Sequence, residues 1–309
     1  MSAVSAAAPT PVATRRWSLH LPQRLRRARP VLNIVLIVIA LFWLVPSIGL
    51  LVISLRPEST FGQSGWWTVL TAPAQLTIEN YRTLFGAGFA AGGILDSLIT
   101  SALITIPTTI LVTVISSLSA YSLVFGRWRG RTAVFLVIVG LLVVPIQVAL
   151  VPVVQLYRAF GNLTGFNPFG TLPGVIIFHV AFGLPFGIFL MRNFYMGIPK
   201  DLLEAGRIDG AGEWKLFRRV VMPLGLPAAA SLAIFQFIWV WNDLLVALVF
   251  LGSNAHQTLT LFLYGQIRTF AASYWVISTG AMISILPPLI VFLSFQRYFV
   301  RGVLAGAVK

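Results

Sequence analysis

The apolar stretches of this chain contain a few polar and aromatic side chains that are chemically suited to binding a solute. Polar groups are costly to bury in lipid, so those that occur within apolar helices often have a role. Amide, imidazole and carboxylate groups can hydrogen-bond hydroxyl groups, and an indole ring can stack on the face of a sugar ring. The candidates for a solute path are Gln147, His179, Gln236, Trp239, Trp241, Asn242 and Asp243. The competing interpretation is that a lone Gln or His bonds to a neighbouring helix.

Asp243 has three possible roles. It lies about 27 Å of helix beyond Gly225, at a rise of about 1.5 Å per residue, which predicts a hydrated position near a membrane surface. Its carboxylate can cap a helix, contact another protein or bind solute. The sequence leaves these three roles open.

The residues offer no catalytic set and no metal site. The three histidines, His20, His179 and His256, are scattered along the chain, and there is no cysteine. A His-Glu-x-x-His pattern is also missing. We therefore expect no catalytic residues, no bound metal and no bound cofactor.

The elements that position these side chains are predicted to be membrane helices. Of the 309 residues, 58% are hydrophobic and 10% are charged, and the mean hydropathy is +0.89. A helix needs about 20 apolar residues to cross a bilayer, and in lipid a helix satisfies its own backbone hydrogen bonds. Six such runs occur, near residues 31–55, 97–125, 132–156, 171–191, 224–251 and 273–295. The predicted fold is all-α, a polytopic bundle of six transmembrane helices, with kinks at Pro145, Pro152, Gly183, Pro185, Pro287 and Pro288.

The distribution of cations predicts the orientation, because Lys and Arg are retained on the cytoplasmic side. With the N-terminus inside, 18 of the 22 basic residues are cytoplasmic, and the other four are Arg56, Arg82, Arg158 and Arg268. Both termini are therefore predicted to be cytoplasmic. The formal net charge of +14 follows from this bias and favours contact with anionic lipid over nucleic acid.

One charged segment, between the fourth and fifth apolar runs, is predicted to form two short helices. Pro199 suits a helix start, Asp201 and Glu204 complement the helix dipole, and Gly210 permits a left-handed turn. A second helix is expected from Glu213 to Met222, ending at Pro223.

The second helix of this segment carries two kinds of side chain at helical spacing. Trp214, Phe217 and Val221 predict an apolar face, and the basic residues Lys215, Arg218 and Arg219 occupy other positions. An aromatic knob surrounded by charge suits a groove on a soluble partner. An amphipathic helix resting on the membrane surface is the alternative.

Several motifs together resemble the EAA loop of ABC-importer permeases, in particular their maltose-type, carbohydrate-importing branch. They are Ile198-Pro199-Lys200-Asp201, Glu204-Ala205, Ile208-Asp209-Gly210-Ala211, Leu224 to Pro227, and Trp241-Asn242-Asp243-Leu244. The C-terminal Gln296 to Gly302 and Ala305 to Lys309 are similar to the tail of a maltose-permease subunit that reaches the ATPase dimer. Gly206 departs from the pattern, since the family more often has a second Ala there, and we expect it to loosen the first helix slightly.

The resemblance implies which residues transmit ATP-driven motion. The ATPase-coupling residues are Glu204, Ala205, Gly206, Asp209, Gly210, Ala211, Trp214, Phe217 and Arg218. The tail residues expected to contact the ATPase are Gly302, Val303, Leu304 and Gly306. No Gly-rich phosphate loop occurs in the sequence, so ATP and Mg are expected on separate subunits.

The implied assembly has a second homologous permease subunit, two cytoplasmic ATP-binding subunits and an extracytoplasmic solute-binding protein, in a prokaryotic cell membrane. The expected organisation is a basic disordered tail at 1–30, a permease domain at 31–295 with the loop at about 193–224, and a C-terminal tail at 296–309. The implied solute is a sugar or oligosaccharide, and Ser64-Gly65-Trp66-Trp67 is reminiscent of α-glucoside permeases. A polyol or glycerol phosphoester is the alternative solute, and a secondary transporter is a more remote alternative.

Overall fold

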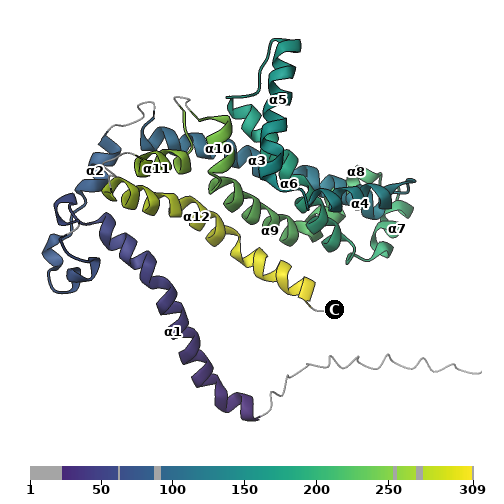
Figure 1. Ribbon diagram of the computed structural model, residues 1–309. Helices are drawn as coiled ribbons and strands as arrows, with labels where there is room; N and C mark the ends of the chain where they lie inside the picture. The colour runs from purple at the N-terminus through teal and green to yellow at the C-terminus, as the bar shows by residue number, and fades with distance from the viewer. Residues whose placement is uncertain (1–22, 62, 87–91, 253–255, 269–273, 308–309) are drawn as a thin grey trace, which may run out of the picture. The chain divides into compact units, whose positions relative to one another are not determined.

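The fold is built from helices, as expected. The computed structural model describes residues 23–61, 63–86, 92–252, 256–268 and 274–307, and these contain helices and turns without strands. The chain divides into two units, residues 1–49 and 50–309, and each is described by itself (Figure 1).

The helices run as follows. They are α1 (Gln23–Ser54), α2 (Glu79–Gly86), α3 (Ile94–Phe125), α4 (Arg131–Leu141), α5 (Ile146–Thr164), α6 (Leu172–Tyr195), α7 (Lys200–Ile208), α8 (Glu213–Leu216), α9 (Met222–Trp241), α10 (Leu245–Phe250), α11 (Leu259–Arg268) and α12 (Tyr274–Ala307), with short 3₁₀ turns η1 (Glu58–Thr60), η2 (Trp66–Leu70) and η3 (Pro73–Gln75) and a π-helical turn η4 (Phe217–Val221).

The first unit is formed by most of α1. The segment Pro30–Ser54 of α1, whose last five residues belong to the second unit, is apolar and long enough to span a membrane. The helix begins at Gln23, inside the segment 1–30 that was expected to be a disordered tail. Residues 1–22 of that segment lie outside the described residues.

In the second unit, α3, α6, α9 and α12 form the packed centre (Figure 1). Helices that pack in lipid favour small residues at their contacts, because these let the backbones approach. At Gly187 of α6, an added Cβ atom would lie 2.3 Å from Ser116 Oγ of α3. The closeness of this contact explains why a glycine stands there.

Three buried clusters form the core of this unit. The first joins the ends of α3 and α6 to η4 and the start of α9, around Tyr121, Tyr195 and Phe217. The second gathers around Phe178 and Phe250, and the third lies around Trp241. The first cluster includes Leu203 of α7 and so anchors the loop α7–α8, and the second contains Phe178, next to the polar residue His179 of α6.

The third predicted span, 132–156, is broken into two helices, and the kink predicted at Pro145 is confirmed. The structure has α4 and α5, bent by 103° across a four-residue break that ends at Pro145. Proline disfavours the helical conformation of the residue before it and has no N–H to donate. Pro152, Pro185, Pro287 and Pro288 are instead accommodated inside helices.

The fifth predicted span, 224–251, is also shorter than expected. Helix α9 ends at Trp241, and α10 begins after a break at residues 242–244. Asn242 Nδ2 donates to the Ile238 carbonyl at 2.8 Å, while the Asp243 carboxylate accepts from the Val246 and Ala247 N–H groups at 3.0 and 3.2 Å. These two polar side chains therefore end one helix and begin the next.

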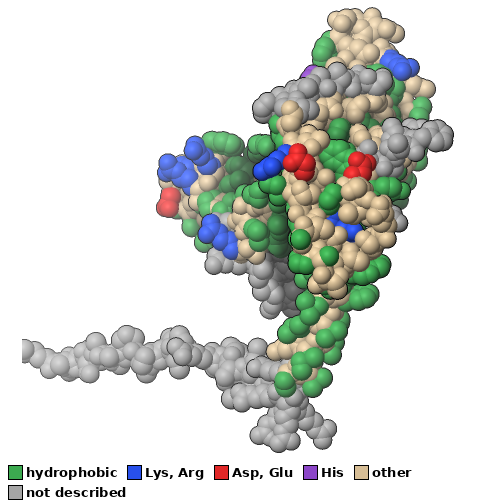
Figure 2. All heavy atoms as spheres, turned by 90° about the vertical axis from the view of Figure 1, so that its left-hand side faces the viewer, with side chains coloured by type: hydrophobic (Ala, Val, Ile, Leu, Met, Phe, Trp, Pro, Cys, Tyr) green, Lys and Arg blue, Asp and Glu red, His purple; other side chains and the backbone are tan. Residues whose placement is uncertain are grey.

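Within the described residues, five helices can cross a membrane by length and composition, or six if the bent pair α4–α5 counts as one span. Many of their large apolar side chains are exposed at the protein surface. Figure 2 shows few charged side chains on the face that it presents, with apolar side chains between them. A surface of this composition fits a lipid environment.

Candidate functional site: the loop α7–α8 and a cavity between α6 and α9

The turn between α7 and α8 is a Schellman motif. Gly210 has φ +77°, the left-handed conformation that the sequence predicted for it. The Gly210 N–H donates to the Arg207 carbonyl, and the Ala211 N–H donates to the Gly206 carbonyl at 2.9 Å. Both bonds satisfy carbonyl groups at the end of α7 that have no partner in the helix itself.

A set of side-chain bonds ties this loop to the bundle. Tyr121 of α3 donates its hydroxyl to Glu213 Oε2 at 2.5 Å, and Arg207 Nε donates to Glu213 Oε1 at 2.9 Å. The hydrogen bond to Glu213 raises the pKa of Arg207 above its usual value. We call Tyr121, Glu213 and Arg207 the clasp, because Glu213 joins α7 and α8 to a transmembrane helix.

The second loop helix does not stop at Pro223, and that prediction is wrong. Helix α8 continues through the π-helical turn η4 directly into α9. A proline inside a regular helix removes one hydrogen bond and crowds the carbonyl four residues before it. The wider π turn just before Pro223 relieves this conflict, so α8, η4 and α9 follow one another without a break.

The exposed apolar surface of the loop differs from the predicted one. Phe217 and Val221 are buried in the bundle, so they cannot form a free apolar face. Phe217 lies between Tyr121 and Trp214, with ring centroids at 5.4 and 5.6 Å. The large apolar side chains that α7 and α8 leave exposed are Trp214, at 64%, Ile208, at 87%, and Leu202, at 46%. We call the two most exposed, Trp214 and Ile208, the apolar knob of the loop.

The other predicted coupling residues lie around this knob. Glu204, Ala205, Asp209 and Arg218 are exposed. Gly206 is close to α8, because a Cβ atom there would lie 2.5 Å from Leu216 Cδ2. Glycine at this position therefore allows the two loop helices to approach, which is a second effect besides the expected loosening of α7.

A cavity of about 270 Å³ lies between α6 and α9. Its lining comprises Phe182, Gly183, Phe186, Phe235, Gln236 and Trp239. Gln236 is 3% exposed, and its Nε2 atom is buried without a hydrogen-bond partner. A Cβ atom at Gly183 would lie 2.8 Å from that nitrogen, so glycine makes room for the amide. A buried donor without a partner is costly and is suited to receiving a ligand oxygen.

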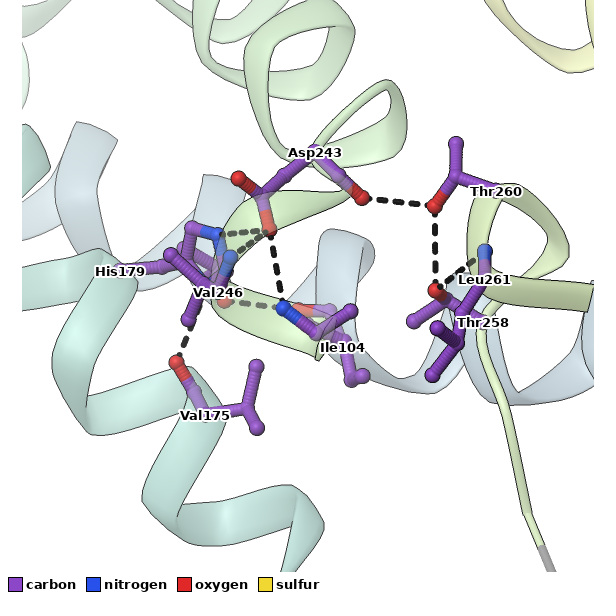
Figure 3. A network of polar contacts seen from close by, with 10 residues as sticks. Ile104, Val175, His179, Asp243, Val246, Thr258, Thr260 and Leu261 are labelled. Atoms are coloured by element: carbon purple, nitrogen blue, oxygen red, sulfur yellow. Dashed lines mark hydrogen bonds and ion pairs between the residues drawn. The ribbon is translucent and has the colours of Figure 1, made fainter. Parts of the chain in front are cut away.

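A polar network continues from this cavity toward α10. The rings of Trp239 and His179 lie 5.8 Å apart, centroid to centroid. In Figure 3, His179 points toward one carboxylate oxygen of Asp243, and its Nε2 atom lies 3.6 Å from that oxygen. The other ring nitrogen of His179 lies 3.0 Å from the Val175 carbonyl, and the Asp243 carbonyl accepts from Thr260 at 2.6 Å.

Comparison with known proteins identifies the family. Residues 112–305 match the family model described as "Binding-protein-dependent transport system inner membrane component". The chain belongs to this family of ABC-transporter permeases. Members are membrane-embedded transport subunits and not enzymes.

Two named relatives of this permease are similar over most of its length. An osmoprotective compounds uptake permease protein of Synechocystis sp. is 41% identical over 90% of this chain and 91% of its own. An alpha-glucoside transport system permease protein of Rhizobium meliloti is 40% identical over 82% of this chain and 66% of its own.

Solved structures show the same fold. A chain of a bacterial ABC transporter that imports the acidic polysaccharide alginate matches with a TM-score of 0.71 and 23% identity, over 90% of this permease and 99% of that chain. A second alginate transporter structure, in complex with a pentasaccharide-bound periplasmic protein, matches with a TM-score of 0.65 and 14% identity, over 89% of this permease and 95% of that chain.

Four of the predicted solute-path residues of this permease, His179, Gln236, Trp239 and Asp243, are brought together, and three are not. Gln147 is exposed on α5. Trp241 is buried and donates to the Ser284 carbonyl at 3.0 Å. Asn242 caps α9. Asp243 acts as a helix cap, which is one of the three roles left open by the sequence.

The predicted C-terminal tail, 296–309, is not separate from the last span, because α12 continues to Ala307. The side chains of Gly302, Val303, Leu304 and Gly306 lie outside the described ones, so their expected contact with an ATPase stays a prediction. Residues 308–309 lie outside the described residues altogether. Among the described residues, no group of three His, Asp or Glu side chains could hold a metal ion.

The clasp and the aromatic lining of the cavity were not predicted from the sequence. Tyr121 and Glu213 are 92 positions apart, so sequence spacing gave no signal for their bond. Phe182 and Phe186 were detectable in principle, since they repeat at four-residue spacing beside Gly183, a pattern that places both on one helix face.

Proposed function

We propose that this permease is one of two homologous transmembrane subunits of an ATP-driven importer. Two cytoplasmic subunits bind ATP and Mg, and an extracytoplasmic binding protein delivers the solute. Family membership supports this division of labour. In this proposal the loop α7–α8 docks on an ATPase subunit and moves with it.

In this proposal the apolar knob makes the contact with the ATPase subunit. Ile208 and Trp214 expose most of their apolar surface on a charged loop, where exposure is costly unless a partner covers it. The clasp and η4 then connect that contact to α3 and α9. A displacement at Trp214 therefore reaches the transmembrane helices through packed and hydrogen-bonded atoms.

The proposed solute is an uncharged glycoside, of which an α-glucoside is the first candidate. Gln236 can hydrogen-bond a hydroxyl group, and Trp239 can stack on a sugar ring. The alpha-glucoside relative supports this solute class. None of the residues that line the cavity in the described structure is charged, which argues against a phosphoester.

A second candidate is a small osmoprotective solute such as a polyol. It is favoured by the relative in Synechocystis, which takes up osmoprotective compounds. The cavity of about 270 Å³ suits a small ligand that occupies one subunit. Both candidates rely on hydroxyl groups, so ligand size is what distinguishes them.

The experiment is solute-stimulated ATP hydrolysis by the assembled importer in lipid vesicles, with its binding protein present. We expect stimulation by α-linked disaccharides such as maltose, trehalose or sucrose, and none by a glycerol phosphodiester. Stimulation by polyols alone would favour the second candidate. Stimulation by a phosphodiester alone would contradict both.

The proposed orientation, with both termini in the cytoplasm, is tested by cysteine labelling in intact cells. Cysteine at Ser59 should react with an impermeant thiol reagent, and cysteine at Ala211 in the loop should not. Ser253, a further external position expected from the sequence, lies outside the described residues. Labelling at position 211 from outside would contradict the orientation.

A further inference from the structure

A second cavity, of about 360 Å³, lies at the end of the bundle that carries the loop α7–α8. Three cations from three helices line it, namely Arg131 of α4, Arg192 of α6 and Lys200 of α7. Thr132 adds a hydroxyl group, and Phe125 is among its apolar walls. No acidic residue is among the described residues that line it, so the cavity concentrates positive charge.

None of the three cations has a neutralising partner among the described residues, and the two arginines are held by other contacts. The ion pairs found in the described residues involve other side chains. The Arg192 guanidinium lies over the Phe135 ring, 3.8 Å from its centroid, and its Nε atom is buried without a hydrogen-bond partner. Arg131 Nη1 donates to the Gly126 carbonyl at 2.9 Å. Like charges gathered around one cavity repel each other, and a bound anion removes that cost.

The position of the cavity indicates the source of the anion. Helix α3 ends at Phe125 and α6 ends at Tyr195, and both are candidate membrane spans; α4 begins at Arg131 and belongs to the bent pair α4–α5, which can cross a membrane only as one broken span. The cavity therefore lies where these spans reach the membrane surface, at the depth of lipid headgroups. Beyond Arg131, α4 exposes Val134 at 44% and Val137 at 64%, which offers an apolar track for acyl chains.

We propose that this cavity binds the phosphate-bearing headgroup of an anionic membrane phospholipid. Arg131, Arg192 and Lys200 contact the phosphate, because guanidinium groups match its geometry and an ammonium group adds charge. The acyl chains lie along α4. A free phosphate ion has no acyl chains and cannot make this apolar contact. The bound lipid joins the ends of α4 and α6 to the start of α7, and so stabilises the base of the loop.

The test uses the full-length permease in its assembled importer, purified from nanodiscs that contain phosphatidylglycerol and phosphatidylcholine. Native mass spectrometry counts the phosphatidylglycerol molecules retained per copy. Arg131→Gln and Lys200→Gln remove charge at exposed side chains, while Arg192 is kept because it also packs on Phe135. Arg129→Gln is the matched control, since it removes one exposed charge from the same connection without lining the cavity.

We expect each cavity variant to lower retention about fivefold and the double variant about 25-fold, from the usual contribution of one cation near anionic lipid. Lys200→Arg should keep retention, and Arg129→Gln should change it less than about twofold. Unchanged retention in the double variant would overturn the proposal. An equal loss in the Arg129→Gln control would assign the effect to general surface charge and also overturn it.

Two further measurements test whether free phosphate or an acidic protein surface, and not lipid, occupies the cavity. If an excess of inorganic phosphate displaces the lipid from the unmodified permease, the site takes free phosphate and the lipid assignment fails. If the isolated permease retains the lipid and the assembled importer does not, an acidic protein surface occupies the cavity, which also contradicts the proposal.

Discussion

The loop α7–α8 and the cavity between α6 and α9 differ in how their polar groups are satisfied. In the loop α7–α8, Glu213 accepts bonds from both Tyr121 and Arg207, and the carbonyl groups at the end of α7 are capped around Gly210. In the cavity between α6 and α9, Gln236 keeps a buried nitrogen without a partner. The loop exposes its apolar groups instead.

This difference indicates what each region has to bind. A part that transmits force must keep its shape under load, so its internal bonds are complete and its free surface is apolar, ready to be covered. A part that binds a hydroxyl-rich solute must leave donors available, at a cost to stability. The predictions below test whether the two regions are separable in this way.

The largest effect is expected at the loop turn. Gly210→Val places a β-branched residue at φ +77°, a strain of about 1–2 kcal/mol. ATP hydrolysis should persist while solute uptake in proteoliposomes falls at least about tenfold, a loss of about 1.4 kcal/mol in coupling. The control is Gly212→Ala, because Gly212 has φ −70° and open space around it. Full uptake by the valine variant would contradict the role of the loop as a rigid lever.

The next effect is expected at the clasp. Tyr121→Phe removes one hydrogen bond to a carboxylate while keeping the aromatic contact with Phe217. Because Glu213 is partly exposed, we expect a loss of about 1 kcal/mol and about fivefold weaker coupling between ATP hydrolysis and uptake. Unchanged coupling in the phenylalanine variant would show that packing alone transmits the movement.

A smaller effect, confined to solute affinity, is expected in the cavity. Gln236→Leu keeps the side-chain volume and removes the unpaired donor, so KM for uptake should rise several-fold with the loop unaffected. Gln147→Leu is the matched comparison, since Gln147 is exposed outside the cavity. If uptake changes in the Gln147 variant and not in the Gln236 variant, the solute path lies elsewhere.

The smallest effect is expected for the ion pair of the clasp. Arg207→Gln removes a charge at a side chain that is 29% exposed, opposite Glu213 at 59%. Exposed pairs contribute about 0.5 kcal/mol, so coupling should weaken no more than about threefold, and less at high salt. A larger loss than that of Tyr121→Phe would reverse the assigned order within the clasp.

Much of the fold could be predicted because membrane helices have a direct compositional signal. The spans at 31–55, 97–125, 171–191 and 273–295 lie within a few residues of the candidate membrane spans in α1, α3, α6 and α12. The predicted helix ends were wrong where a polar side chain bonds to the backbone. Hydropathy averages over a window of residues, so the span predicted at 224–251 ran past the helix end at Asn242 and Asp243, whereas the kink at Pro145 could be predicted from the proline itself.

The loop α7–α8 also contains one feature that the sequence could predict and others that it could not. Gly210 could be assigned from sequence, because a positive φ is a local property of one residue. The burial of Phe217 could not be predicted from the sequence, because it depends on contact with Tyr121 of a helix far away in the chain. Likewise, Ile208 is exposed because no other helix in the described part of the bundle packs over it, which the sequence does not indicate.

The sequence by itself determined the membrane-helix class, the family resemblance and the left-handed turn, because each depends on composition, motif spacing or one residue's backbone. Only the tertiary structure decided which polar residues meet. It placed Gln236, Trp239 and His179 together, turned Trp241 and Asn242 away, and joined Tyr121 to Glu213. The physical reason is that helix rotation and packing set which faces touch, and these depend on contacts between residues far apart in the chain.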